Sequence, residues 1–316
     1  MDYTTLDFFG YNEDQKKVLA LLKESRFGGE KIALMTAPSF VVDFDPESFV
    51  PLMRGLGFDK ITELTFGAKI VNQHYHKFIH DHYSSYVSNG KKKDENFQKV
   101  FIASVCPASV SLIQTQHPEL TKYLLPFVSP MGAMAKIIKK NFPKYKIVFL
   151  SPCGAKKVEA TKILQRNKKP LIDACVTFLE MKQIIAKEKP QKMGSKKFDS
   201  FYNDYTKIYP LSGGLSSTLH YKGILKKEEI VFEDGCADLQ RLFSNHPDKV
   251  FYDILFCDSG CIGGPGVASR KPIFWRKNRV INYRNKSRRN KAGKRIGLEK
   301  YTKGLDFSMD YSKKDF

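Results

Sequence analysis

The sequence DILFCDSGCIGGPG, residues 253–266, runs from a short apolar segment directly into two cysteines and a glycine-rich turn. The same order occurs in VFIAS at 100–104, followed by Cys106, and in KIVFL at 146–150, followed by Cys153. Short apolar runs that end in a small-residue or polar loop are typical of buried parallel strands. These stretches therefore predict strands at 100–104, 146–150 and 253–256, each with a cysteine beyond its carboxyl end.

Further strand and helix patterns alternate along the chain. Apolar runs at 31–35 and 171–176 are strand-like, and helical patterns occupy 51–56, 68–86, 130–141 and 177–187. This alternation predicts an α/β fold with mainly parallel sheets flanked by helices. In such folds, binding sites gather beyond the carboxyl ends of the strands, where the cysteines lie.

Length and composition indicate a globular protein. The 316 residues suffice for one large core or two smaller ones. No apolar run approaches the roughly 20 residues of a membrane helix, and the first ten residues are acidic and aromatic, unlike a signal peptide. We expect a soluble cytoplasmic protein that does not enter a membrane. Six scattered cysteines are too few for a disulfide framework and favour metal binding or buried thiols.

The formal net charge of +20 is concentrated near the carboxyl terminus. A basic surface attracts polyanions and acidic proteins whatever the fold. Because no nucleic-acid motif accompanies the charge, a solvated tail or a helix that docks on an acidic protein is favoured over nucleic-acid recognition. The cations between residues 270 and 303 include Arg276, Lys277, Arg279, Arg284, Arg288, Arg289, Lys294 and Arg295.

The neighbours of four cysteines favour ligand chemistry. Cys106 precedes a proline and a helical pattern, so it is expected at a helix N-cap, where the helix dipole favours thiolate. Cys153 stands close in sequence to Lys156 and Lys157, whose positive charges also favour the thiolate. The glycines after Cys257 and Cys261 let backbone N–H groups approach an anionic, sulfur-rich group.

Spacing alone leaves three interpretations of these four thiols open. They suit a 4Fe-4S cluster, a tetrahedral zinc site or inert buried cysteines. Cys175 and Cys236 lack comparable proline and glycine neighbours and are expected to be structural. His76 and His80 have the i, i+4 spacing of a helical metal pair, but without a glutamate between them we interpret the segment as an amphipathic helix with surface histidines.

Read in order, motifs between about residues 31 and 267 resemble the large-subunit catalytic domain of FeFe hydrogenases. The resemblance implies two interleaved α/β lobes at 31–269 with an iron-sulfur site between them, a helical extension at 1–30 and a basic extension at 270–316. The similar segments are Ala37-Pro38-Ser39, Leu56-Gly57-Phe58-Asp59, Val105-Cys106-Pro107-Ala108, Ser129-Pro130-Met131, Pro152-Cys153 with Ala155-Lys156-Lys157, Ser212-Gly213-Gly214 and Cys257-Asp258-Ser259-Gly260-Cys261.

The same resemblance implies an H-cluster. A 4Fe-4S cubane would be held by Cys106, Cys153, Cys257 and Cys261, with Cys261 bridging to a two-iron subsite that carries CO, cyanide and a dithiolate. Lys156 would donate a hydrogen bond to a cyanide, and Pro38, Ser39, Pro130 and Met131 would line the subsite. The implied partners are H2, the proteins that mature the cluster, and ferredoxin or another acidic electron carrier, steered by Lys122, Lys136, Lys139 and Lys140 or by the basic tail.

Departures from the family pattern concern proton supply. Val105 stands where the standard catalytic form has a proton-shuttling cysteine, and relay carboxylates expected near Tyr75 and Phe78 are absent. His74, on the same helix, is a hypothetical substitute carrier, and Ser151 replaces a methionine beside Cys153. No ferredoxin-like C-x2-C-x2-C-x3-C run precedes residue 31.

These departures resemble the branches of the family that are assigned to sensing. We therefore expect an oxidoreductase of low or altered activity, which binds H2 or slowly interconverts it with protons and electrons, including in a sensing role. Two alternatives remain at this point. One is a non-catalytic 4Fe-4S protein of the iron-sulfur assembly type, and the other is a module that binds polyanions through its basic tail.

Overall fold

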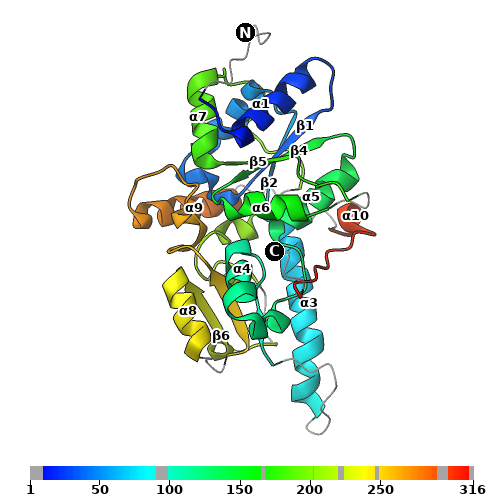
Figure 1. The fold of residues 1–316 in the computed structure, drawn as a ribbon, viewed down its shortest axis with the longest axis vertical. Coiled ribbons are helices and arrows are strands. Elements are labelled where there is room, and N and C mark those ends of the chain that lie inside the picture. The colour runs from blue at the N-terminus through cyan, green and yellow to red at the C-terminus, as the bar shows by residue number, and fades with distance from the viewer. Residues whose placement is uncertain are drawn as a thin grey trace.

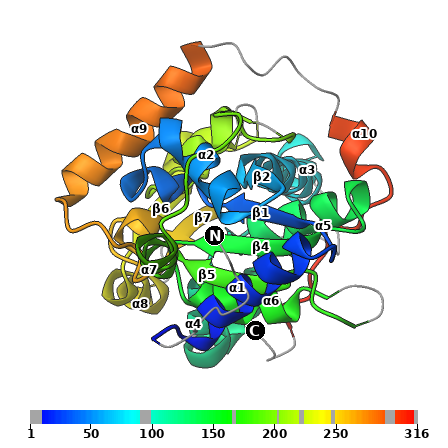
Figure 2. The same cartoon turned by 90° about the horizontal axis from the view of Figure 1, so that it is seen from above.

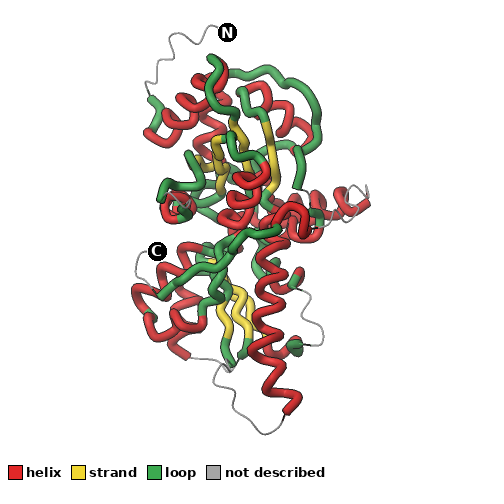
Figure 3. The backbone as a smooth tube through the Cα atoms, turned by 90° about the vertical axis from the view of Figure 1, so that its right-hand side faces the viewer, coloured by secondary structure: helices red, strands yellow, loops and turns green. Residues whose placement is uncertain are grey.

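The computed structural model describes residues 10–89, 99–164, 168–201, 203–219, 224–245, 249–289 and 298–312. It has two lobes, each built around a parallel sheet, stacked along the long axis of the molecule (Figure 1, Figure 3). The predicted fold class, an α/β protein with parallel sheets and flanking helices, is confirmed.

The sheet of the first lobe has the strand order β2-β1-β4-β5. Leu34 in the centre of β1 pairs with Ile61 of β2 on one side and Val148 of β4 on the other. All of β1 and β5 is buried, which explains why these strands are continuous apolar runs without alternation. The strands are β1 (Ile32–Thr36), β2 (Lys60–Glu63), β4 (Lys146–Ser151) and β5 (Ala174–Thr177).

Helices surround this sheet: α1 and α6 pack toward β5, and α2 packs beside β2 (Figure 2). Local hydrogen bonds fix the amino-terminal ends of α1 and α2. Asn12 and Gln15 form a capping box on α1, and Asp45 caps α2 before Pro46. α2 therefore begins five residues before the predicted start at 51. The helices are α1 (Glu13–Arg26), α2 (Pro46–Leu56), α5 (Pro130–Asn141), α6 (Ala155–Lys162), α7 (Phe178–Glu188) and α9 (Ile273–Arg289).

The second lobe holds the sheet β3-β7-β6, and it packs against α4 and α8. β3 is shorter than the predicted strand at 100–104. The Ser104 N–H donates to the Tyr75 hydroxyl (2.9 Å) rather than to a neighbouring strand, so the chain leaves the ladder and turns toward the space between the lobes. The elements are β3 (Phe101–Ile102), β6 (Ile230–Asp234), β7 (Phe251–Leu255), α4 (Pro107–Gln116) and α8 (Cys236–Asn245).

One long helix, α3 (Thr65–Asn89), starts directly after β2 in the first lobe and runs down the length of the second (Figure 1). It packs extensively on α5. Its inner face carries large buried side chains, including Val71, Tyr75 and Ile79. These residues give the two lobes a shared wall.

The carboxyl-terminal region packs back onto the molecule. α9 rests on three 3-10 helices, η1 (Pro38–Val42), η3 (Tyr205–Ile208) and η6 (Gly260–Gly263). After α10 (Leu298–Thr302), Ser308 forms a bridge with Phe127, and Gln114 donates to the Tyr311 carbonyl (2.7 Å). The predicted boundaries at 30 and 270 remain predictions, although α1 packs on β5 and α7 in the first lobe.

Two arginines of α9 make hydrogen bonds to backbone carbonyls of the same chain. Arg276 donates to the Ile262 carbonyl (3.0 Å), and Arg279 donates to the Val41 carbonyl (3.2 Å). The side chains of Arg288 and Arg289, and residues Lys294 and Arg295, lie outside what the structure describes. No helix among the described residues is long and apolar enough to cross a membrane.

Lys157 of α6 joins three helices. Its ammonium contacts Asp14 of α1 (2.5 Å) and Glu180 of α7 (2.6 Å). The sequence-based expectation that Lys157 supports the Cys153 thiolate is therefore wrong, because the side chain turns toward these two carboxylates. It also acts on Glu180, whose pKa falls below its ordinary value although burial opposes the change.

Replacing Lys157 with methionine should lower the free energy of unfolding by about 1.5–3 kcal/mol, because two carboxylates lose a charged hydrogen-bond partner. Urea denaturation monitored by circular dichroism measures the change. Lys17→Met, at an exposed lysine on α1, is the matched control. A change no larger than that of the control would contradict the anchoring role.

Candidate metal centre

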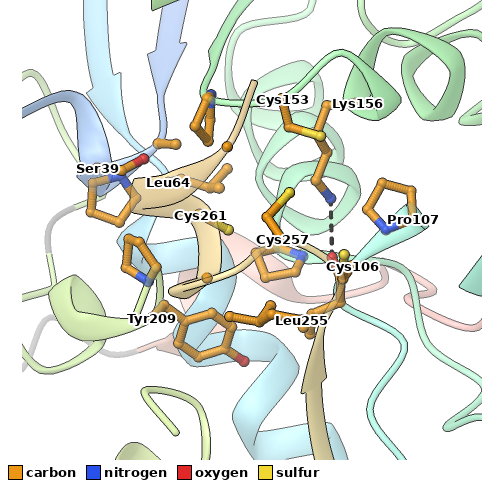
Figure 4. A pocket seen from close by; sticks show the side chains of 18 of the residues that line it. Ser39, Leu64, Cys106, Pro107, Cys153, Lys156, Tyr209, Leu255, Cys257 and Cys261 are labelled. Carbon is orange, nitrogen blue, oxygen red and sulfur yellow. Dashed lines mark hydrogen bonds between the residues drawn. The ribbon is translucent and has the colours of Figure 1, made fainter. Parts of the chain in front are cut away.

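A cavity of about 90 Å3 lies between the lobes, and all four predicted cysteines line it. Figure 4 shows the side chains of Cys106, Cys153, Cys257 and Cys261 directed into the same space. They come from the ends of β4 and β7, from η6 and from the start of α4. The parallel sheets thus bring thiols that are up to 155 residues apart in sequence (261 − 106) to one place.

Local interactions fix the first two cysteines. Cys106 is the N-cap of α4 and Pro107 occupies the first helical position, as predicted. At Cys153, the backbone N–H donates to the Ser151 hydroxyl (3.0 Å), and that hydroxyl donates to the Cys153 carbonyl (2.9 Å). Ser151 therefore shapes the turn that presents the thiol.

Glycines allow the other two cysteines to approach. Gly260 has a φ of +69°, and a Cβ there would lie 2.6 Å from the Pro210 carbonyl oxygen. The same carbonyl accepts a hydrogen bond from the Cys261 N–H (2.8 Å). A Cβ on Gly264 would lie 2.6 Å from the Pro152 carbonyl oxygen. Only a residue without a side chain fits at these two close approaches.

Burial dominates the acidity of the thiols. It raises the pKa of Cys257 to about 12 and that of Cys261 well above its ordinary value, and neighbouring cysteines add to both shifts. Burial also raises the pKa of Cys153, and the opposing effect of Lys156 is smaller. The thiols need a positive charge in the cavity to become thiolates, and bound iron or zinc supplies one while releasing protons.

The arrangement distinguishes between kinds of metal site. Within the described residues, no three histidine, cysteine, aspartate or glutamate side chains converge on a point that could hold a single ion. Four thiols that surround one cavity without meeting at one point suit a cluster of several metal atoms better than a tetrahedral zinc ion. The same result gives no support for a metal site at His76 and His80.

Lys156 lies at the edge of the cavity and is already well positioned. Its ammonium donates to the Val105 carbonyl (3.1 Å; Figure 4) and to Glu159 (2.5 Å). Glu159 is 3% exposed, so the ion pair is held away from solvent. These two contacts hold Lys156 beside the cysteines, while its role toward a bound group stays a prediction.

Two buried hydroxyl groups on the cavity wall have no partner. Ser39 and Thr65 both line the cavity, and neither Ser39 Oγ nor Thr65 Oγ1 has a hydrogen-bond partner in the part of the chain that the structure describes. A buried donor without a partner costs about 1–3 kcal/mol. These hydroxyls therefore favour a bound group that accepts hydrogen bonds. Thr65 was not predicted, because β2, which places it there, gave no recognised strand signal.

Not every residue expected in the cavity lies there. Pro38 and Pro130 line it, but Met131 is fully buried elsewhere in the core. The chain direction explains this, because Pro130 starts α5 at the cavity and the next residue already turns into the helix interface. Val105 lines the cavity, so a side chain that cannot carry a proton stands beside Cys106.

Tyr75 and His74, farther along α3 than Thr65, are not part of the lining. The Tyr75 hydroxyl lies 2.9 Å from Ser104 Oγ, and His74 lies between Phe127 and Phe307 with ring-centre distances of 5.1 and 5.2 Å. Burial and the nearby Lys77 lower the pKa of His74. The hypothesis that His74 carries protons to the cavity receives no support from this position.

The remaining two cysteines lie apart from the cavity. Cys175 is a buried member of β5, where burial raises its pKa far above its ordinary value. Cys236 begins α8 and borders a neighbouring groove of about 430 Å3. Neither cysteine lines the cavity, and a structural role for the two stays a prediction.

The structure is thus a two-lobed α/β protein whose four cysteines line one cavity between two parallel sheets. The family model described as "Iron only hydrogenase large subunit, C-terminal domain" matches residues 30–265. The chain therefore belongs to this family.

Known relatives and solved structures agree with this assignment. "Iron hydrogenase 1" of Clostridium pasteurianum is 25% identical, with 74% of this chain and 47% of that protein covered, so the chain spans about half the length of this relative. An FeFe-hydrogenase HydA1 variant from Chlamydomonas reinhardtii superposes with a TM-score of 0.70 at 13% identity, covering 95% of this chain and 100% of that one. A structure of HydA(deltaEFG), whose title concerns stepwise H-cluster assembly, superposes with a TM-score of 0.68 at 14% identity, covering 85% of this chain and 88% of that one.

Gly264→Ala should destabilise the protein by about 1–3 kcal/mol, because the added methyl group would meet the Pro152 carbonyl where the two lobes join. Gly154→Ala is the matched control, since a Cβ at Gly154 would have nothing within 4 Å. Thermal unfolding of both variants measures the difference. Equal melting temperatures would show that the close approach at Gly264 is not needed.

Proposed function

We propose that this chain carries an H-cluster and slowly interconverts H2 with protons and electrons, including in a sensing role. One observation carries the proposal: four thiols, a lysine and two hydroxyls that lack a partner among the described residues surround the same buried cavity. Membership of the iron-only hydrogenase family supports it. The cubane would bind to Cys106, Cys153, Cys257 and Cys261.

The other cavity residues fit a two-iron subsite with CO, cyanide and a bridging dithiolate. When bound, this subsite would supply the place at which the H–H bond is broken or formed. Ser39 and Thr65 would donate hydrogen bonds to its acceptor atoms, and Lys156 would contribute a positive charge close to a cyanide. Apolar side chains such as Leu64, Phe149 and Leu255 would exclude water from the cavity.

Proton supply explains why we propose slow turnover. A general acid or base must lie within hydrogen-bond reach of the proton that it transfers. Val105 cannot serve at the position beside Cys106, and burial raises the pKa of Tyr75 far above its ordinary value, which disfavours its ionised form. A chain that holds the cofactor but lacks the usual carrier suits detection of H2 better than rapid production.

An electron carrier would need to approach the cubane closely. The groove of about 430 Å3 beside Cys236 shares Pro107, Ala108 and Phe256 with the cavity wall, so a small acidic carrier such as ferredoxin would come near the cysteines there. The prediction that Lys136 and Lys140 of α5 steer this carrier is less favourable, because both lysines already have partners. Lys136 donates to the Asp306 carbonyl (2.7 Å) and Lys140 to that of Lys303, so the carboxyl-terminal segment uses both cations.

Infrared spectroscopy tests the proposed cofactor. Protein produced anaerobically with the H-cluster maturation proteins should show CO and cyanide bands together with the visible absorption of a cubane. Cys257→Ser should lose most of the cubane absorption because one thiolate ligand is removed, whereas the control Cys236→Ser should keep it. A cubane without CO and cyanide bands would contradict the proposal and favour a non-catalytic 4Fe-4S protein.

Val105→Cys tests the interrupted proton supply. A thiol at this position can carry a proton, so H2 turnover should rise about tenfold or more if proton delivery limits the rate. Hydrogen evolution with reduced methyl viologen measures the rate. Val105→Ala alters the volume without adding a protonatable group and should show no gain. Equal rates in the two variants would mean that another step is limiting.

A further inference from the structure

Behind the cavity wall lies a buried polar group formed by Glu63, Lys207 and Tyr283. The Lys207 ammonium pairs with the Glu63 carboxylate and donates to the Tyr283 hydroxyl (2.8 Å). It also lies 3.9 Å from the centre of the Tyr283 ring. The side chains of Lys207 and Glu63 are 0% and 1% exposed. We refer to these three residues as the relay cluster.

The relay cluster is close to the cavity through the chain segments that carry it. Glu63 ends β2, two residues before Thr65 of the cavity wall. Lys207 stands two residues before Tyr209, which also lines the cavity. Tyr283 packs edge-on against Phe40, the neighbour of Ser39, at 5.5 Å between ring centres. Each member of the relay cluster is therefore linked to a different part of the cavity wall, by the adjoining chain or by a ring contact.

The outer end of the relay cluster reaches solvent. Tyr283 borders an open groove of about 740 Å3 between the start of α2, residues 196–198 and α9. The groove wall carries both signs of charge, from Asp45, Glu47, Lys197 and Lys286 among others. Tyr283 therefore connects the buried ion pair with the wall of an open groove.

The inner end of the relay cluster has unused hydrogen-bonding capacity next to the segment that forms the cavity wall. Among described residues, Glu63 Oε1 has no hydrogen-bond partner, although the other carboxylate oxygen pairs with Lys207. Thr65 Oγ1, on the cavity wall, also lacks a partner. The Thr65 backbone is held in place because its carbonyl accepts from the Thr206 hydroxyl (2.6 Å). Within the described ranges, the short segment 63–65 therefore carries one carboxylate oxygen and one hydroxyl without a partner.

Burial brings the pKa values of Glu63 and Lys207 closer together. It raises the pKa of Glu63 and lowers that of Lys207, while their mutual attraction opposes both shifts. Asp204 also acts on both groups, raising the pKa of each, and Tyr283 stabilises the Glu63 carboxylate. A buried pair whose acidities approach each other can share a proton, as groups that transfer protons do.

We infer that Glu63, Lys207 and Tyr283 conduct protons between the open groove and the cavity, by a route separate from the position occupied by Val105. The inference rests on the proposed function. For outward transfer, Glu63 takes up a proton released in the cavity, Lys207 receives it as its own proton passes to Tyr283, and the Tyr283 hydroxyl proton leaves to groove water. One proton moves and no electrons do, so each group returns to its starting charge.

A purely structural role gives a different expectation. A buried ion pair can also anchor α9 to η3 and β2, and removal of one partner then costs about 3–5 kcal/mol of stability. In that case the variants would unfold more easily, but turnover per loaded molecule and its pH dependence would not change. The two roles are therefore separable by measurements on protein that has been shown to be folded and loaded.

The test uses the full chain, matured anaerobically, with the substitutions Glu63→Gln and Tyr283→Phe. Formation of HD from H2 in D2O should fall at least about tenfold per loaded molecule in both variants, because a general acid or base is lost. Glu63→Asp, which keeps the carboxyl group, should recover part of the rate and the wild-type pH profile. Tyr311→Phe removes a buried hydroxyl that donates to the Phe127 carbonyl (2.9 Å) and should leave the rate unchanged.

Two further measurements make the result interpretable. The CO and cyanide infrared bands report loading, and photoreduction of the cubane reports electron entry; both should match the unsubstituted chain in all variants. Tyr283→Phe keeps the ion pair and its packing, so it tests the route even if Glu63→Gln does not fold. Unchanged HD formation and pH profile in loaded variants would overturn the relay alone. Absent bands in the unsubstituted chain would overturn the proposed function and the relay together.

Discussion

The contact between two backbone segments at the lobe interface holds the site together. The Pro152 carbonyl, at the end of β4 in the first lobe, accepts a hydrogen bond from the Gly266 N–H (2.9 Å), which follows β7 of the second. Gly264 packs against the same carbonyl. Cys153 stands next to one partner and Cys261 lies close to the other, so this contact sets the distance between thiols that belong to different sheets. The two lobes must dock correctly before a four-cysteine cavity exists.

Without a bound group, the cavity is energetically unfavourable, because it buries groups that need charge or hydrogen-bond partners. Burial keeps water away, but it also makes ionisation of Cys257 and Cys261 unfavourable. Ser39 and Thr65 add hydroxyl groups that have no partner in the part of the chain that the structure describes, and Lys156 adds a positive charge held by Glu159. A bound metal cluster would relieve these costs together, by replacing protons on sulfur and accepting hydrogen bonds. The stability of the interface and the occupancy of the site are therefore linked.

The elements that could be predicted from sequence are those with strong local signals. Continuous apolar runs located β1 and β4, the Ser129-Pro130 start located α5 correctly, and Cys106-Pro107 marked the N-cap of α4. β2 and β6 were not recognised, because they are short and mix charged with apolar residues. The Glu63–Lys207 pair was also missed. Its members are 144 residues apart, and each looks like an ordinary surface charge until the fold buries them together.

The interleaved order of the two sheets has a consequence for how the protein is made. β3 of the second lobe is synthesised before β4 and β5 of the first, yet its partner β7 emerges only after both. Cys106 therefore leaves the ribosome long before Cys257 and Cys261, and the cavity cannot close while the chain is growing. Contacts between such distant segments make folding slow. A metal group held by all four cysteines would therefore have to enter after these segments have been made and the two lobes have come together.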